Sequence, residues 1–372
     1  MARTATAAVV PEIGAPFALT GVTLDAPRPD EVVVRLVAAG LCHTDLSVRA
    51  GKLPSPFPVV LGHEGAGFVE EVGYRVTSVT PGDKVLLSFT SCGTCGNCLA
   101  GHPAYCAGFL PLNFGGARAD GSGTLSGDGG PVTGPVAGHF FGQSSFATYA
   151  LADERCLVKV APDAPLDLLA PLGCGMQTGA GTVLNVLRPE IGSTLAVFGV
   201  GAVGLAAVMA AALGGPSRIV AVDVVPERLE LARELGATDV VDARGGEVAA
   251  ALRDLTGGAG VDYTVEASGN VGALSAAIDA LALRGTCAIV GAPAFGTTVP
   301  VDVNGLLGGK RVVGVTEGDA DPRRFLPLLA DLVARGVFPL DKLVRHYPFV
   351  DIEKAVLATE RGEVVKAVLT FD

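Results

Sequence analysis

The chain has 372 residues, too long for one hydrophobic core, so we expect two domains. Hydrophobic residues make up 49% of it and the net charge is −11, which excludes a disordered or fibrous chain and argues against a nucleic-acid partner. We expect neither a signal peptide nor a membrane-spanning run, so the predicted location is the cytoplasm. Thiols stay reduced there, and clustered cysteines favour a metal over disulfides.

The N-terminal part of the chain contains short apolar runs separated by Gly and Pro, a pattern that predicts β-strands joined by turns. Examples are EVVVRLVAAG, AGFVEEVG and DKVLLSF, which begin at Glu31, Ala66 and Asp83. The segment 118–138 is rich in glycine and is predicted to be a long loop with little strand or helix pattern.

From Ser193 onward, apolar strand patterns alternate with helical patterns. We predict strands at 194–198, 218–222, 261–266, 286–290 and 311–315. One helix, PERLELARELG, has Pro226 in its first turn and Gly236 just past its end. Buried strands alternating with helices predict a doubly wound parallel sheet. After Pro322 we expect a helix and two short strands.

Gly199, Gly201 and Gly204 form a G-x-G-x-x-G motif between an apolar strand and an apolar helix, and Asp223 ends the next strand. This context predicts a dinucleotide site, in which the glycines permit a tight turn, close approach of the pyrophosphate and close helix packing. Asp223 can accept hydrogen bonds from a ribose but would repel a 2′-phosphate. Because Val224 and Val225 supply no cation, NAD is favoured over NADP.

Four cysteines form the pattern C-x2-C-x2-C-x7-C. Four thiolates on tight turns can close a tetrahedron around zinc, which predicts a structural site; an iron–sulfur cluster is the less favoured alternative. These residues are Cys92, Cys95, Cys98 and Cys106.

A catalytic zinc needs three protein ligands and an open position. Outside the cysteine cluster, the candidates are Cys42, His63 and Cys174, whose separation in the sequence cannot show that they meet. We expect Cys156 and Cys287 to be buried structural thiols.

Seven motifs in order resemble those of the zinc-dependent medium-chain alcohol dehydrogenases over essentially the whole chain. They are GLCHTD, GHEGAG, GDKV, the four-cysteine segment, GCGMQTG, GVGAVG and a basic residue before the final strand. The resemblance implies an α/β chain with a GroES-like β-rich catalytic domain at 1–174, including a structural zinc lobe at about 88–110. It further implies a Rossmann NAD-binding domain at 175–317 and a segment, 318–372, that completes the catalytic domain.

By this resemblance the chain binds two zinc ions, one catalytic and one structural. The implied catalytic ligands are Cys42, His63 and Cys174, and the implied structural ligands are the four clustered cysteines. Glu64 matches an acidic residue that approaches the metal during ligand exchange, and Asp45 matches the carboxylate that orients His63. Thr44 matches the hydroxyl residue that hydrogen-bonds the substrate oxygen.

The resemblance also implies contacts with NAD beyond the glycines and Asp223. It places Arg228 near the adenosine ribose and Thr178 behind the nicotinamide ring, and it places His43 and Lys366 at the pyrophosphate.

Ser47 departs from the family pattern, because liver-type members have at this position the histidine that ends the proton relay. A serine is a poor base, so either water reaches the ribose directly or another group takes the proton. His43 and His139 are considered for this role, and the sequence assigns it to neither.

The phrases GHFFGQSSFATYAL and TEGDADPRRFLP are similar to those of bacterial aryl-alcohol (benzyl alcohol) dehydrogenases. The predicted function is therefore the interconversion of a primary aryl alcohol and its aldehyde by hydride transfer to or from NAD. The implied pocket walls are Phe140, Phe141, Leu53 and Ala292, although each phenylalanine could instead be ordinary core.

Several alternatives stay open at this point. They are a terpenoid or aliphatic alcohol dehydrogenase, a thiol-dependent formaldehyde dehydrogenase of the same superfamily, and a zinc-knuckle binding protein without activity. Because related enzymes pair the sheets of their cofactor domains, we expect a homo-oligomer, either a dimer or a tetramer. The substrate is expected to be a small molecule, with neither a membrane nor a nucleic-acid partner.

Overall fold

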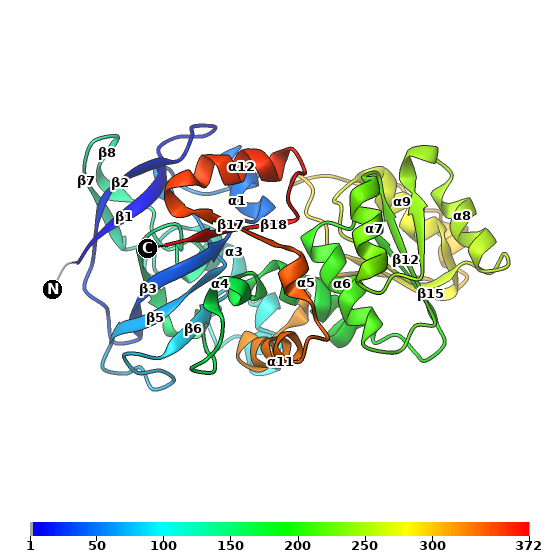
Figure 1. The fold of residues 1–372 in the computed structure, drawn as a ribbon, viewed down its shortest axis with the longest axis horizontal. Helices are drawn as coiled ribbons and strands as arrows, with labels where there is room; N and C mark the ends of the chain where they lie inside the picture. The colour runs from blue at the N-terminus through cyan, green and yellow to red at the C-terminus, as the bar shows by residue number, and fades with distance from the viewer. Residues whose placement is uncertain (1–2, 372) are drawn as a thin grey trace. The chain divides into compact units, whose positions relative to one another are not determined.

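The computed structural model describes residues 3–371, which form two compact units. Unit 1 contains the described residues up to Cys174, Asp321–Ala334 and the described residues from Leu340 onward. Unit 2 contains Gly175–Ala320 and Arg335–Pro339. Unit 1 therefore combines segments from both ends of the sequence, which Figure 1 shows as blue and red ribbons lying side by side. Within the described chain, no helix combines the length and the apolar character needed to cross a membrane.

Unit 1 contains two β-sheets, one of five strands in the order β4-β1-β2-β7-β8 and one of seven strands. The first sheet consists of β1 (Arg3–Val10), β2 (Ala18–Leu24), β4 (Val59–Val60), β7 (Leu125–Gly129) and β8 (Val132–Val136). The second has the order β10-β6-β5-β3-β18-β17, and β9 also pairs with β3. It consists of β3 (Glu31–Gly40), β5 (Gly65–Val72), β6 (Lys84–Leu87), β9 (Tyr149–Asp153), β10 (Leu157–Lys159), β17 (Val344–Pro348) and β18 (Lys366–Thr370).

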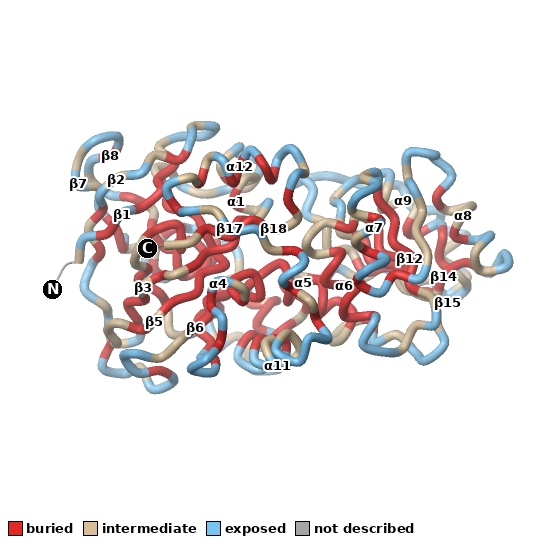
Figure 2. The backbone as a smooth tube through the Cα atoms, viewed as in Figure 1, coloured by how far each residue is buried: buried red, intermediate tan, exposed pale blue. Residues whose placement is uncertain are grey.

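Strand β3, in the middle of the second sheet, is deeply buried. Figure 2 shows it largely in the colour of buried residues, and eight of its ten residues are buried. The helices of unit 1 are α1 (His43–Arg49), α2 (Gly96–Leu99), α3 (Phe109–Phe114), α4 (Leu166–Leu169), α11 (Pro322–Ala334) and α12 (Ile352–Glu360).

The glycine-rich segment 118–138 is not the featureless loop expected from the sequence, because it contains the antiparallel hairpin β7-β8. Leu125, Val132 and Val136 are buried on one face of this hairpin. The other positions of that face, 127, 129 and 134, are glycines, which hide the period-two alternation of apolar residues. The loop prediction was therefore wrong.

A buried ion pair attaches this segment to the central sheet. The Arg118 guanidinium donates from Nε to Glu31 Oε1 (2.6 Å) and from its terminal nitrogen to Glu31 Oε2 (3.1 Å). Both residues are only 7% exposed, and the other terminal guanidinium nitrogen contacts the Asp25 carboxylate at 3.0 Å. Because Glu31 begins β3, this two-bond contact holds the hairpin segment against the strand that leads to Cys42.

Unit 2 contains a parallel six-stranded sheet in the order β13-β12-β11-β14-β15-β16. This order is the doubly wound arrangement typical of Rossmann domains. The strands are β11 (Thr194–Phe198), β12 (Arg218–Asp223), β13 (Asp239–Asp242), β14 (Val261–Glu266), β15 (Leu281–Ile289) and β16 (Arg311–Gly314). The helices are α5 (Gly175–Gly181), α6 (Ala202–Ala212), α7 (Pro226–Glu234), α8 (Val248–Leu255), α9 (Val271–Asp279) and α10 (Val303–Leu306).

All five strands predicted for this part of the chain are present, and α7 begins at Pro226 as predicted. Strand β13 was not predicted, because its four residues, DVVD, lack a long apolar run and are only partly buried.

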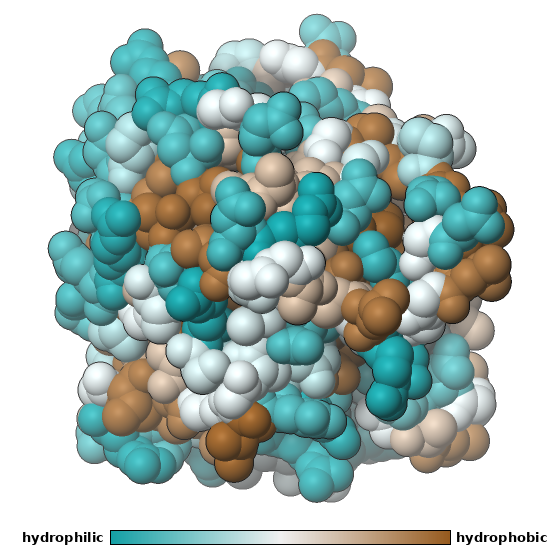
Figure 3. All heavy atoms as spheres, turned by 90° about the vertical axis from the view of Figure 1, so that its right-hand side faces the viewer, coloured by the Kyte–Doolittle hydropathy of each residue, from teal (hydrophilic) through white to brown (hydrophobic). Residues whose placement is uncertain are grey.

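Hydrophobic side chains also reach the surface of the molecule: Figure 3 shows them on one face in several separate groups among hydrophilic ones.

Candidate functional site

The structure brings Cys42, His63 and Cys174 together within unit 1. Their ligand atoms and a carboxylate oxygen of Glu64 all lie within 4.8 Å of one another. The register of the central sheet explains part of this convergence, because Ala39 of β3 pairs with Gly65 of β5. The antiparallel pair therefore places the residues just after β3 beside those just before β5.

Cys174 reaches the cluster from a separate segment, after the short helical turn Ala170–Gly173. The residue before it is attached to the end of β6, because the Ser88 hydroxyl donates to the carbonyl oxygen of Gly173 at 2.6 Å. Three segments that are far apart in the sequence thus supply two thiols and one imidazole to a single buried location.

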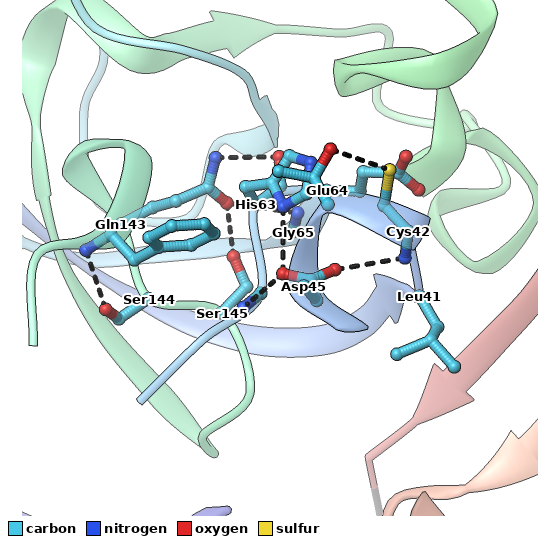
Figure 4. Close-up of polar contacts among 12 residues, drawn as sticks. Leu41, Cys42, Asp45, His63, Glu64, Gly65, Gln143, Ser144 and Ser145 are labelled. Atoms are coloured by element: carbon cyan, nitrogen blue, oxygen red, sulfur yellow. Dashed lines mark hydrogen bonds and ion pairs between the residues drawn. The ribbon is translucent and has the colours of Figure 1, made fainter. Parts of the chain in front are cut away.

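The Asp45 carboxylate joins the segments that carry Cys42 and His63 (Figure 4). Its Oδ2 accepts from the backbone N–H of Cys42 at 3.0 Å. Its Oδ1 accepts from the backbone N–H of Gly62 at 3.0 Å and lies 2.9 Å from Nδ1 of His63. Because Asp45 and His63 are 0% exposed, this carboxylate sets both the position and the tautomer of the ring.

The residues present fit a metal ion with soft and borderline ligands. Nε2 of His63 is buried and has no hydrogen-bond partner among the described residues. The hydrogen bond with Cys174 holds the pKa of Cys42 well below its usual value, against the opposing effect of burial. Burial alone would lower the pKa of His63, but the charge and the hydrogen bond of Asp45 raise it well above its usual value. The cluster thus favours positive charge at His63 Nε2, where a metal cation can replace the proton.

Lys366 lies in this cluster and pairs with Glu64. Its Nζ is 2.7 Å from Glu64 Oε1 and donates to the carbonyl oxygen of Leu41 at 3.2 Å. Burial alone would lower the pKa of Lys366, but the charge of Glu64 and that of the nearby thiolate of Cys42 raise it. The pyrophosphate contact predicted for Lys366 stays a prediction, and in the structure described here its ammonium group contacts Glu64.

The four clustered cysteines form a second set of ligands, with their sulfur atoms within 4.8 Å of one another. Backbone N–H groups point at these sulfurs: that of Cys92 lies 3.3 Å from Cys106 Sγ, and that of Cys95 lies 3.3 Å from Cys92 Sγ. The N–H groups of Thr94 and Cys95 lower the pKa of Cys92 to about 5. Four thiols with such backbone support fit a closed tetrahedral metal site.

In unit 2, the glycine motif adopts the turn expected from the sequence. Gly199 has φ +82°, a conformation that favours glycine, and Gly201 precedes the first residue of α6. A Cβ on Gly204 would lie 2.0 Å from the carbonyl oxygen of Gly199, whereas a Cβ on Gly201 would have no neighbour within 4 Å. Gly204 therefore serves close packing, and the space beside Gly201 is open.

Asp223 ends β12 beside this turn. Its Oδ2 accepts from the N–H of Val200 at 2.7 Å, and its Oδ1 accepts from those of Val224 and Val225 at 2.8 and 2.9 Å. A cavity of about 440 Å³ opens next to it. Its lining includes Gly199, Asp223, Val224, Ser268, Asn270 and Ala273. Arg228 lies in the first turn of α7, and its buried Nε has no hydrogen-bond partner among the described residues.

Thr178 lies on α5 and contacts an acidic residue that the sequence analysis did not single out. Its Oγ1 lies 3.3 Å from Glu317 Oε2, which also accepts from Gln177 Nε2 at 3.0 Å. Glu317 has φ +49°, and Asp319 has φ +47°. Glu317 belongs to the sequence phrase TEGDADP, and that phrase is similar to one in aryl-alcohol dehydrogenases. Nothing else in the sequence marks this acid.

Three of the remaining polar residues named from the sequence, His43, Thr44 and Ser47, lie on α1. Thr44 Oγ1 is 3.7 Å from Cys42 Sγ, and both Thr44 and Ser47 are half-buried. His43, the first residue of the helix, is exposed. His139 is buried, and burial lowers its pKa to about 4, with Glu31 and Arg118 as its charged neighbours.

The rings of Phe140 and Phe141 surround the imidazole of His63. Phe141 stacks on it with ring centres 4.4 Å apart, and Phe140 meets its edge at 5.5 Å. The two phenylalanines are 0% and 3% exposed and belong to the core of unit 1, against which the half-buried Leu53 also packs. Ala292 lies in unit 2, in an exposed segment after β15.

Comparisons with family models, with curated proteins and with solved structures all match this chain to dehydrogenases. Residues 28–163 match the family model of the alcohol dehydrogenase GroES-like domain, and residues 202–334 match that of the zinc-binding dehydrogenases. The chain is 46% identical over 370 residues to a geraniol dehydrogenase of Castellaniella defragrans, covering 99% of this chain and 98% of the relative.

Two solved structures cover 100% of both chains. An alcohol dehydrogenase zinc-binding domain protein from Burkholderia ambifaria has a TM-score of 0.97 and 50% identity. The benzyl alcohol dehydrogenase of Acinetobacter calcoaceticus has a TM-score of 0.94 and 45% identity.

The two glycines of the turn predict opposite results for alanine substitution. Gly204→Ala should lower the thermal unfolding midpoint, because the added methyl collides with Gly199 and overpacking costs about 1–3 kcal/mol. Gly201→Ala should leave this midpoint unchanged; if the open space beside Gly201 receives the pyrophosphate, as the motif predicts, the added methyl should weaken NADH binding by about tenfold or more. Calorimetry and NADH fluorescence would measure both effects. Unchanged NADH affinity in Gly201→Ala would contradict the dinucleotide site.

Proposed function

This chain belongs to the zinc-binding alcohol dehydrogenase family, and we propose that it interconverts a primary benzyl-type alcohol and its aldehyde with NAD. The family and the fold class, a GroES-like domain with a Rossmann domain, were predicted from the sequence and are confirmed. The observation that carries the proposal is the buried convergence of Cys42, His63 and Cys174 beside the Asp45 carboxylate.

We propose that each chain binds two zinc ions. Cys42, His63 and Cys174 would hold one ion and leave a position for the alcohol oxygen, while the four clustered cysteines would enclose the other completely. Zinc bound at the first site supplies Lewis acidity, which lowers the pKa of an alcohol oxygen. Asp45 keeps the His63 ring in the tautomer that presents Nε2 to the metal.

The hydroxyl groups of α1 support a path for the alcohol proton. Thr44 Oγ1 is beside Cys42 Sγ, so it would accept a hydrogen bond from the bound alcohol. Ser47 lies three positions later on α1, and residues at this spacing share a helix face. Because a serine hydroxyl is a poor base, Ser47 would pass the proton on, with water as the final acceptor.

The site in unit 2 favours NAD over NADP. The Asp223 carboxylate is fixed by three backbone N–H groups beside the cavity, where it can accept hydrogen bonds from ribose hydroxyls. A 2′-phosphate at this place would be repelled by the carboxylate. The roles of Thr178 behind the nicotinamide ring and of Arg228 near the ribose are part of the same proposal.

Similarity to two relatives supports the substrate class. One relative is named for benzyl alcohol and the other for geraniol. Both compounds are primary alcohols whose reacting carbon is attached to an unsaturated carbon. Phe140 and Phe141 are buried around His63 in the core of unit 1, so the proposed substrate class rests on the two relatives rather than on these rings. Geraniol is therefore the second candidate.

We also propose that the chain forms a homo-oligomer through the sheet edge of unit 2. Strand β16 is at the end of the sheet, and apolar residues around it are exposed. Leu283 is 78%, Val303 69% and Leu307 79% exposed. A second copy would cover these side chains and extend the sheet beyond β16. Light scattering should give the mass of a dimer or tetramer, and a monomer mass would overturn this part of the proposal.

The zinc assignment predicts two ions per chain, measured by elemental analysis after exhaustive dialysis. Cys174→Ser should retain one ion and lose turnover, since the first site loses one of three ligands. Cys156→Ser is the matched control: this thiol is also buried but belongs to neither cluster, so both ions should remain. A single zinc in the unmodified chain would favour the zinc-knuckle alternative.

The substrate proposal predicts NADH formation, followed by absorbance, from benzyl alcohol and NAD. We expect kcat/KM for benzyl alcohol to exceed that for ethanol by roughly 100-fold, because the ring buries several additional carbon atoms. Geraniol would be measured beside it, and a higher value for geraniol would transfer the assignment to the second candidate. Preference for NADP would contradict the interpretation of Asp223.

A further inference from the structure

We propose that Gln143 is a positioning residue for the metal centre, because its carboxamide fixes the main chain around His63. The inference rests on the proposed binding of metal by Cys42, His63 and Cys174. Gln143 was not recognised in the sequence, where it appeared only within the phrase GHFFGQSSFATYAL.

The carboxamide of Gln143 is 0% exposed and uses its donors and acceptor inside the protein. Its Nε2 donates to the carbonyl oxygens of His63 at 3.0 Å and Ser88 at 2.8 Å. Its Oε1 accepts from the N–H of Gly65 at 3.1 Å and from the Ser145 hydroxyl. A buried polar network that is fully satisfied in this way is rigid and selects one geometry.

Asp45 and Gln143 hold the His63 segment at different points, as Figure 4 shows. Asp45 contacts the ring and the N–H of Gly62, whereas Gln143 contacts the carbonyl of His63 and the N–H of Gly65. Asp45 thus sets the direction of the ring. Gln143 fixes the position of the main chain from which the ring projects.

Gln143 also connects His63 to the segment that carries Cys174. The carbonyl of Ser88 accepts from Gln143, and the hydroxyl of Ser88 donates to the carbonyl oxygen of Gly173 at 2.6 Å. Two of the three proposed ligands are therefore held relative to each other through one side chain and one serine. A shift of Gln143 would alter the distance between a thiolate and an imidazole ligand.

Gly65 allows the carboxamide to come this close to the chain. A Cβ at this position would lie 2.5 Å from Ser145 Oγ and 3.1 Å from Gln143 Oε1. In the segment that carries Gln143 itself, Phe141 and Ser144 have φ of +53° and +50°. The backbone of this turn is thus held in a sparsely populated conformation on either side of the inward-pointing Gln143.

A merely structural role is separated from a positioning role by a matched variant. Asn113 has a carboxamide that is likewise 0% exposed, accepts from the N–H of Thr90 at 3.0 Å and donates to the carbonyls of Thr90 and Phe109. It lies in unit 1, and these hydrogen bonds go to Thr90 and Phe109 rather than to the His63 segment. Gln143→Met and Asn113→Leu both remove buried amide hydrogen bonds, so both should lower the thermal unfolding midpoint.

Only Gln143→Met should change the metal site. We expect its affinity for zinc at the Cys42, His63 and Cys174 site to fall by about 10–100-fold, measured by competition with a chromophoric chelator. The visible bands of cobalt placed at this site should shift, while the zinc of the four cysteines is retained. Asn113→Leu should keep the affinity and the cobalt bands of the unmodified protein.

Gln143→Asn keeps the carboxamide on a shorter side chain and covers the case in which Gln143→Met does not fold; we expect it to lose less zinc affinity, and Gln143→Glu tests the donors. Gln143→Glu keeps the length and the acceptor for Gly65 but places a carboxylate oxygen against the carbonyls of His63 and Ser88, so we expect a loss of zinc affinity at least as large as in Gln143→Met. Zinc affinity and cobalt bands that are unchanged in a folded Gln143 variant would overturn the proposal. A single zinc in the unmodified chain would instead overturn the proposed metal site and this role with it.

Discussion

A buried carboxylate organises the centre of unit 1. Asp45 is fully buried, and a buried anion is tolerated only if charged or polar groups surround it. The donors that satisfy it are the N–H groups of Cys42 and Gly62 and the ring of His63, so the requirement to compensate one charge assembles the ligand segments. The arrangement of Cys42, His63 and Gly62, on which the proposed metal site rests, thus follows in part from the need to compensate Asp45 inside the protein.

The local architecture is matched to that requirement. Strands β3 and β5 are antiparallel, so the end of β3 lies beside the start of β5. Cys42 and His63 therefore lie close together at one end of these strands, in short loops that can present polar atoms. A second carboxylate, Glu64, is compensated there by Lys366 of β18. The centre therefore combines soft thiol ligands with two buried acids, each of which has its own partner.

Much of the fold could be predicted from the sequence, because its signals are local. The glycine motif, the alternation around it and Pro226 at the start of α7 each depend on neighbouring residues, and the structure agrees with them. The β7-β8 hairpin escaped prediction because glycines at its inward positions conceal the alternation. Gln143 and Glu317 escaped because an amide or acid in a loop carries no pattern, and only the folded chain shows which backbone groups it meets.

The pairing of β18 with β3 has a consequence for how the chain is made. Lys366 and Glu64, which form the buried pair at the centre, are 302 positions apart, and all of unit 2 is translated between them. Because synthesis proceeds from the N-terminus, Ala38, Ala39 and Gly40 of β3 present an unpaired edge until residues 368–370 have been added. During that interval the nascent chain exposes an unpaired strand edge, at which another strand could pair in place of β18.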